Sequence, residues 1–141
     1  GGNAFTNAIM QDLKIDETKA RGMKENEGLL RRGQEASAYT SIIGVAAALR
    51  DEIYQRVAYW DAAHKESKEL IAQILLCGGN ASIPGLSGYL ASGLSASVEV
   101  GNPWVNVTNF DDYIPDIPAR EALKYTTALG LALRNFEKNA I

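Results

Sequence analysis

Two adjacent glycines, Gly78 and Gly79, are the residues whose types and spacing most directly suggest binding chemistry. They end an apolar run over residues 71–77, which predicts a strand buried on both faces. Pro84 follows in the first turn of a predicted helix. Glycine has no Cβ, so a flat or phosphorylated ligand can approach its backbone closely, and positive φ values cost little. The stretch therefore predicts either a ligand-binding turn, with Asn80 beside it, or a plain connection without a ligand.

The elements that would position this turn follow a strand–helix–strand–helix order over residues 71–141. A second short strand is predicted at residues 97–100, where small polar and apolar residues alternate before a turn. A last helix is predicted from Pro118 to about Asn135. Gly130, in the middle of that helix, costs about 1 kcal/mol relative to alanine, so we expect a neighbour to pack closely there.

Residues 1–70 carry the periodicity of helices. Three are expected, over residues 5–13, 17–30 and 35–64. Asn3 or Thr6 is expected to cap the first helix. Asp16, with Glu17 and Thr18, is expected to open the second, because acidic residues at a helix start suit its macrodipole. In the third, apolar residues recur at spacings of three and four and should be buried: Ile42, Ala46, Leu49, Ile53, Val57 and Trp60. Together the two parts predict one partial domain of a helix-rich α/β class.

The loop after the second predicted strand, residues 101–118, is acidic and aromatic. We expect its apolar anchors to be Trp104, Val107 and Phe110. Its carboxylates do not have the spacing of a calcium loop: Asp111, Asp112 and Asp116. The single histidine, His64, is interpreted as a surface residue, because no second metal ligand accompanies it. No metal site and no acid–base pair is predicted.

Composition narrows the class of protein further. A chain of 141 residues that is 46% hydrophobic can form a core. A net charge of −3 offers no basic stripe, so we expect no nucleic-acid partner. Cys77 is the single cysteine, and no charged and apolar leader precedes Gly1, which favours a reducing cytosol. The longest apolar run is shorter than the roughly 20 residues that span a bilayer.

Three stretches resemble a known family. Residues 75–85, Leu-Leu-Cys-Gly-Gly-Asn-Ala-Ser-Ile-Pro-Gly, resemble the adenosine motif of the actin and sugar-kinase superfamily. Residues 98–104 and 122–134 resemble more narrowly the PilM family of type IV pilus assembly proteins, actin-like ATPases related to FtsA. This resemblance implies part of an actin-like ATPase (ribonuclease H-like) domain. The chain would be its second lobe, with the N-terminal strands of that lobe missing and a small inserted subdomain within residues 1–70.

The resemblance also implies a nucleotide site. Gly78, Gly79 and Asn80 would border the adenosine of ATP or ADP, which the intact protein would bind with Mg. Lys24 matches a family lysine that reaches the nucleotide, and Arg21 stands where the family usually has a glutamate, which weakens the ribose contact. Lys24 is equally well interpreted as a solvated helix lysine. The intact protein would be at most a weak ATPase, and we expect this chain alone to be inactive.

The implied role is assembly of the inner-membrane platform of the type IV pilus. A PilN-like peptide would be bound by a lobe that this chain lacks, and the protein would be cytoplasmic and held at the inner membrane through partners. The alternative is a scaffold of cell division, similar to FtsA, or of a secretion system that binds protein partners without ATP turnover. Missing strands would leave a sheet edge exposed and favour self-association. A complete small domain is the other interpretation of the chain.

Overall fold

The computed structural model describes residues 3–31, 37–65, 70–105, 107, 111 and 113–137. It is a helix-rich α/β structure, as the sequence predicts. Its elements are α1 (Asn3–Leu13), α2 (Glu17–Asn26), α3 (Ala38–Ala63), β1 (Gln73–Leu76), η1 (Gly79–Ser82), α4 (Leu86–Ala91), β2 (Ser97–Val100), α5 (Ala119–Ala122), η2 (Leu123–Tyr125) and α6 (Thr126–Glu137). Contacts divide the chain into a first unit, residues 1–74 and 83–99, and a second unit, residues 75–82 and 100–141.

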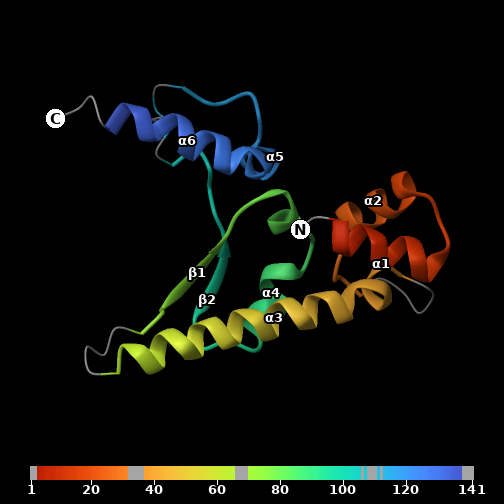
Figure 1. The fold of residues 1–141 in the computed structure, drawn as a ribbon. Coiled ribbons are helices and arrows are strands. Elements are labelled where there is room, and N and C mark those ends of the chain that lie inside the picture. Colours follow the sequence, from red (N-terminus) through yellow and green to blue (C-terminus); the bar gives the residue numbers. More distant parts are fainter. Residues whose placement is uncertain are drawn as a thin grey trace. The chain divides into compact units, whose positions relative to one another are not determined.

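The core of the first unit lies among its helices. α1 packs against both α2 and α3, at the red and orange end of the chain in Figure 1. The apolar face of α1 buries Phe5 and Ile9, and α3 buries Ile42 and Ala46. Ala20 of α2 has no exposed surface, so α1 and α2 lie close together there. Close packing of small and branched side chains excludes water from this core.

Helix α2 begins where the sequence predicts and ends earlier than expected. The Asp16 carboxylate accepts the N–H of Lys19 at 3.0 Å, and this hydrogen bond holds the pKa of Asp16 below its usual value. The helix ends at Asn26, not near residue 30, because Gly28 turns the backbone with a φ of +53°. A Cβ at Gly28 would lie 2.5 Å from the carbonyl oxygen of Pro84. Only glycine fits this turn.

Helix α3 begins at Ala38, three residues later than expected, because Ser37 has an extended backbone and forms its N-cap. The prediction that its apolar row is buried is correct at Ile42 and Ala46 and wrong at Trp60, which is 44% exposed. The Trp60 ring stacks on the ring of His64, with centroids 3.9 Å apart. Near its C-terminal end, α3 therefore places an aromatic pair at the surface.

The two strands pair in parallel. The N–H groups of Ser97 and Gly101 donate to the carbonyl groups of Ala72 and Leu76, each at 2.9 Å. Both arrows accordingly point the same way in Figure 1. Parallel strands need a crossover, which α4 and its flanking turns supply. The prediction of two strands is therefore confirmed, at Gln73–Leu76 and Ser97–Val100.

The expectation that the first strand is buried on both faces is wrong. Burial alternates along β1, and Leu75 is 58% exposed. In the register set by these hydrogen bonds, one face carries half-buried apolar residues and the other carries exposed ones. The first face carries half-buried Ile74, Leu76 and Val98 and ends at Val100, which is 43% exposed, and the second carries exposed Gln73, Leu75, Ser97 and Glu99. The two-stranded sheet found in the described residues therefore has one face that is largely packed and one that is exposed to solvent.

Helix α4 is shorter than the periodicity predicts. It starts at Leu86, two residues beyond Pro84, because Gly85 has a φ of +78° and occupies the N-cap position. It ends at Ala91, so Leu94 lies outside it. Its residues Leu86 and Leu90 are buried, and α4 packs against α3.

The helix predicted from Pro118 is divided into three consecutive elements. α5 is a single turn, η2 follows it, and α6 begins at Thr126. Close packing was expected at Gly130, but a Cβ there would contact no described atom within 4 Å. Leu131, beside it, is 61% exposed. The side chains of residues 135–137 and all of residues 138–141 lie outside the description.

Candidate functional site

The glycine turn, residues 78–82, links β1 to α4. Gly78 has a φ of +90°, and a Cβ placed on it would meet no heavy atom within 4 Å. The carbonyl of Gly78 accepts the N–H of Ala81 at 3.0 Å, and the Ser82 hydroxyl donates to the carbonyl of Gly79 at 2.9 Å. These bonds order the turn without covering Gly78. The backbone at Gly78 is therefore bare, as a ligand that stacks on the main chain requires.

The two glycines of this turn differ in conformation. Of the pair, only Gly78 has a positive φ value. Gly79 lies in η1, where a Cβ would be 3.6 Å from the Cβ of Lys124, an ordinary contact. Asn80 and Ser82 have side chains of the type that caps a helix, but the N-cap position of α4 belongs to Gly85. The turn thus forms a short helix of its own before α4.

Two basic residues that the sequence analysis missed lie beside the glycine turn. Arg120 of α5 donates from Nη2 to the carbonyl of Ser82 at 2.9 Å. Lys124 of η2 is the nearest side chain to a Cβ at Gly79, and its ammonium lies 5.2 Å from the ring centroid of Tyr125. The signal for this pair was their four-residue spacing after Pro118, which places two side chains on one face of a helix. A flat or anionic ligand at the turn would have a cation within reach.

Lys24, which the resemblance assigns to the nucleotide, is a buried residue of the first unit. It is 7% exposed, and Nζ donates to the hydroxyl of Thr6 at 3.2 Å. Burial lowers the pKa of Lys24 below its usual value of 10.5, because the charged form loses hydration. The interpretation of Lys24 as a solvated helix lysine is therefore wrong. Thr6 is likewise no helix cap, because it lies inside α1 with 4% of its surface exposed.

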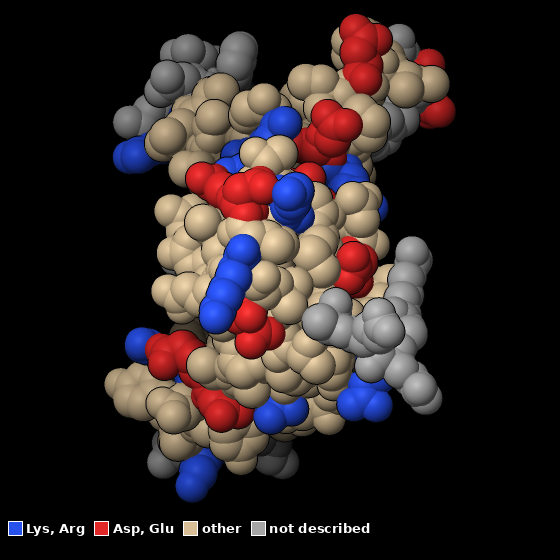
Figure 2. Space-filling view, turned by 90° about the vertical axis from the view of Figure 1, so that its right-hand side faces the viewer, with Lys and Arg blue, Asp and Glu red and all other residues tan. Residues whose placement is uncertain are grey.

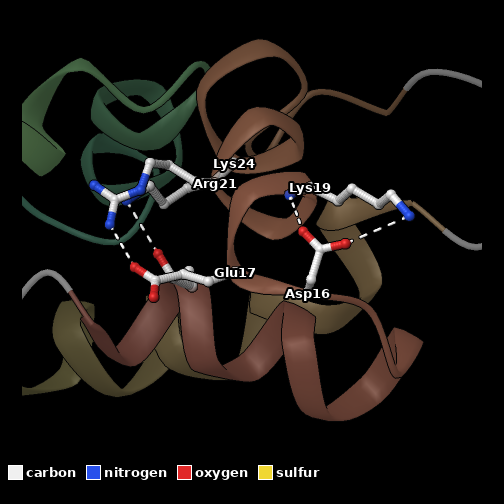
Figure 3. Close-up of polar contacts among 6 residues, drawn as sticks. Asp16, Glu17, Lys19, Arg21 and Lys24 are labelled. Carbon is white, nitrogen blue, oxygen red and sulfur yellow. Dashed lines mark hydrogen bonds and ion pairs between the residues drawn. The ribbon is translucent and has the colours of Figure 1, made fainter.

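Arg21 lies at the surface of the first unit. Its guanidinium forms an ion pair with Glu17, one turn earlier on α2, and both side chains are more than half exposed (Figure 3). On the face that Figure 2 displays, basic and acidic side chains are interspersed among uncharged ones. The structure thus brings Gly78, Gly79 and Asn80 together in the second unit and places Arg21 and Lys24 in the first.

The residues that the structure describes also bear on metal binding and on membrane insertion. Among them, no group of three or more His, Cys, Asp and Glu side chains is placed to hold a metal ion. Asp112 and Phe110 of the acidic loop lie outside the described residues. Among the helices that are described, none has the length and apolar character to cross a bilayer.

The parallel β–α–β unit, its bare glycine turn and the helical first unit define a helix-rich α/β class of protein. A solved structure of this class, a PilM-PilN type IV pilus biogenesis complex, contains a chain with a TM-score of 0.72 and 25% sequence identity. The alignment covers 95% of the present chain and 36% of that chain, so this chain spans about a third of its relative's length. No curated protein sequence gives a significant match.

The sequence profile of the family described as "Type IV pilus assembly protein PilM" matches residues 1–136. This match covers nearly the whole chain. The chain therefore belongs to the PilM family, and the family resemblance read from the three stretches is confirmed.

Proposed function

We propose that this chain is part of the second actin-like lobe of a protein that acts in type IV pilus assembly, and that it supplies the adenosine side of an ATP or ADP site. The observation that carries the proposal is the bare backbone at Gly78, directly after β1, in a chain of the PilM family. The backbone at Gly78 matches a planar ring in shape, because the space that a Cβ would fill there is open.

In this proposal Gly78 and Gly79 lie against the adenosine, and Asn80 offers an amide at the edge of the same turn. Lys124, whose Cβ lies next to Gly79, contributes a basic side chain, which favours the electron-rich face of a purine or a phosphate oxygen. Arg120 holds the turn in place through the Ser82 carbonyl. Arg21 and Lys24 enter the proposal on the family resemblance alone, as residues that would reach the ribose and the base.

The phosphates and Mg belong to other parts of the intact protein in this proposal. Within the described residues no acidic cluster offers a cation site, and the proposal assigns to this chain the base and sugar contacts. We accordingly expect hydrolysis, if the intact protein performs it, to depend on residues beyond this chain. This chain alone is expected to leave ATP unchanged.

The proposed setting is the cytoplasmic side of the inner membrane, where partners would hold the protein in the pilus platform. The solved relative is named as a complex of PilM with PilN. We propose a PilN-like peptide as the partner of the intact protein here as well, bound outside this chain. Self-association through a sheet edge stays a prediction, to be tested by sedimentation over a range of concentrations.

The test is adenine-nucleotide binding by the protein as its gene encodes it, measured with a fluorescent ADP analogue. Gly79→Val places a branched side chain where the ligand needs bare backbone. We expect it to weaken binding about tenfold, which corresponds to about 1.4 kcal/mol. Gly88→Ala, in α4, is the control, because it adds a side chain at a glycine outside the turn, where a Cβ meets no atom within 4 Å. It should leave the affinity within about twofold.

Lys124→Ala tests the contribution of the Lys124 side chain to nucleotide binding separately from that of the glycine backbone. It should weaken binding by roughly threefold, as expected for one cation–π or exposed ionic contact. Unchanged affinity in Gly79→Val, with the fold intact by circular dichroism, would remove the adenosine assignment. Phosphate release by the 141-residue chain above a buffer blank, with contaminating ATPases excluded, would overturn the division of labour.

A further inference from the structure

The acidic loop between β2 and α5, residues 101–118, contains a pocket that the nucleotide proposal does not use. Its volume is about 360 Å³, and its lining residues are Trp104, Val107, Tyr113, Pro115, Asp116 and Ile117. Five of these six side chains are apolar or aromatic, and the sixth carries a carboxylate. All of them belong to the second unit.

Hydrogen bonds hold the walls of this pocket in place. The indole Nε1–H of Trp104 donates to the carbonyl of Ile117 at 3.1 Å, which ties together two points thirteen residues apart. The backbone N–H of Trp104 donates to the side-chain oxygen of Asn102 at 3.0 Å, and the N–H of Val107 donates to the Trp104 carbonyl at 2.9 Å. The indole is therefore fixed in orientation. A pocket with a fixed aromatic wall needs little ordering when a ligand enters.

The charge of the loop selects the ligand. Residues 101–118 contain three aspartates and no lysine, arginine or histidine. Asp116 lies in the pocket wall, beside aromatic rings whose faces attract cations. The same charge repels phosphate groups and anionic lipid surfaces. Tyr113, 57% exposed, and Ile114, 76% exposed, leave apolar surface at this loop for the aliphatic stem of a long basic side chain.

We propose that this pocket binds an arginine or lysine side chain presented by a basic, extended segment of a partner protein. The cation lies against the aromatic wall and pairs with the Asp116 carboxylate, while its methylene stem covers Tyr113 and Pro115. This partner surface is separate from the glycine turn, and it stands whether or not the chain binds a nucleotide.

The experiment uses the protein as its gene encodes it and a fluorescein-labelled octapeptide of alternating arginine and glycine, with binding followed by fluorescence anisotropy. Octapeptides that carry glutamine or proline in place of arginine are the ligand controls. Asp116→Asn removes the pocket charge at constant shape, and Asp111→Asn removes one charge from the same loop outside the pocket lining. Tyr113→Leu and Tyr113→Phe form a second pair, in which only the first removes the ring.

We expect the arginine peptide to bind more tightly than either control peptide. Asp116→Asn and Tyr113→Leu should each weaken its binding about threefold or more, whereas Asp111→Asn and Tyr113→Phe should change it less than about 1.5-fold. The proposal is overturned if the arginine peptide does not bind or if the proline peptide binds equally well. It is also overturned if the two aspartate variants lose affinity equally, because the net charge of the loop then suffices.

Discussion

The first unit builds a core across several helices, whereas the second unit, among its described residues, buries little beyond the contact of the glycine turn with α5 and η2. Fully buried large side chains of the first unit come from three different helices: Ile9, Ile42 and Leu90. In the second unit the buried hydrophobic residues are Ala81, Ala122 and Leu123, while Val105, Ile114 and Leu131 are each more than 60% exposed.

This difference indicates a division of roles. Burial of branched side chains supplies most of the free energy of folding, so the first unit is the more stable part. The second unit carries both surfaces that are proposed above to bind other molecules, the glycine turn and the acidic loop. The predictions below test whether stability and surface are separated in this way.

The largest effect is expected from removing a core side chain of the first unit. Ile42→Ala should lower the free energy of unfolding by about 2–5 kcal/mol, because the helices around a fully buried residue collapse only in part. Leu131→Ala, in the second unit, should change it by less than about 0.5 kcal/mol, because that side chain is 61% exposed. Urea unfolding followed by circular dichroism measures both. Equal losses would contradict the division.

A second contrast compares two glycines with positive φ. Gly28→Ala should cost about 2–4 kcal/mol, because the new Cβ is strained and lies 2.5 Å from the Pro84 carbonyl oxygen. Gly78→Ala carries the same kind of strain, but its Cβ meets nothing within 4 Å, so about 1 kcal/mol is expected. Thermal unfolding of both variants gives the difference.

The control for this pair is Gly22→Ala, which lies inside α2 with open space at the Cβ position. It should stabilise the protein by about 0.5–1 kcal/mol through helix propensity. If Gly28→Ala were no more harmful than Gly78→Ala, the contact of Gly28 with Pro84 would not be part of the first unit in solution.

The smallest effect concerns the buried Lys24. Because burial lowers its pKa, the native state releases this proton before the unfolded state does, and native stability therefore rises with pH up to about 10.5. Lys24→Met removes the buried charge and one hydrogen bond to Thr6, so at pH 7 its unfolding free energy should stay within about 1 kcal/mol of the original. The unfolding free energy of Lys24→Met relative to the original protein should fall as the pH approaches 10.5, because the original protein gains stability over that range.

Urea unfolding at a series of pH values checks this slope. The same variant also tests the nucleotide assignment of Lys24. If Lys24 has only a structural role, Lys24→Met leaves the nucleotide affinity unchanged. If Lys24 contacts the base, the substitution weakens nucleotide binding several-fold. A flat difference across the pH series would mean that the ammonium is hydrated in the native protein.

Much of the local structure could be predicted because local rules decide it. The start of α2, both strands and the glycine turn between β1 and α4 follow from residue type and spacing. The ends of helices could not be predicted as well. α2 ends at Asn26, before the turn at Gly28, and Pro84, far away in the sequence, leaves no room for a Cβ at that turn.

The candidate site divides in the same way. The sequence by itself determined the family, the α/β class and the bare glycines, because these depend on short motifs and on the absence of a Cβ. Only the tertiary structure decided that Lys24 is buried against Thr6, that Arg120 and Lys124 stand beside the turn, and that Trp104 closes a pocket with Ile117. Those placements depend on contacts between residues distant in sequence, which periodicity does not encode and packing does.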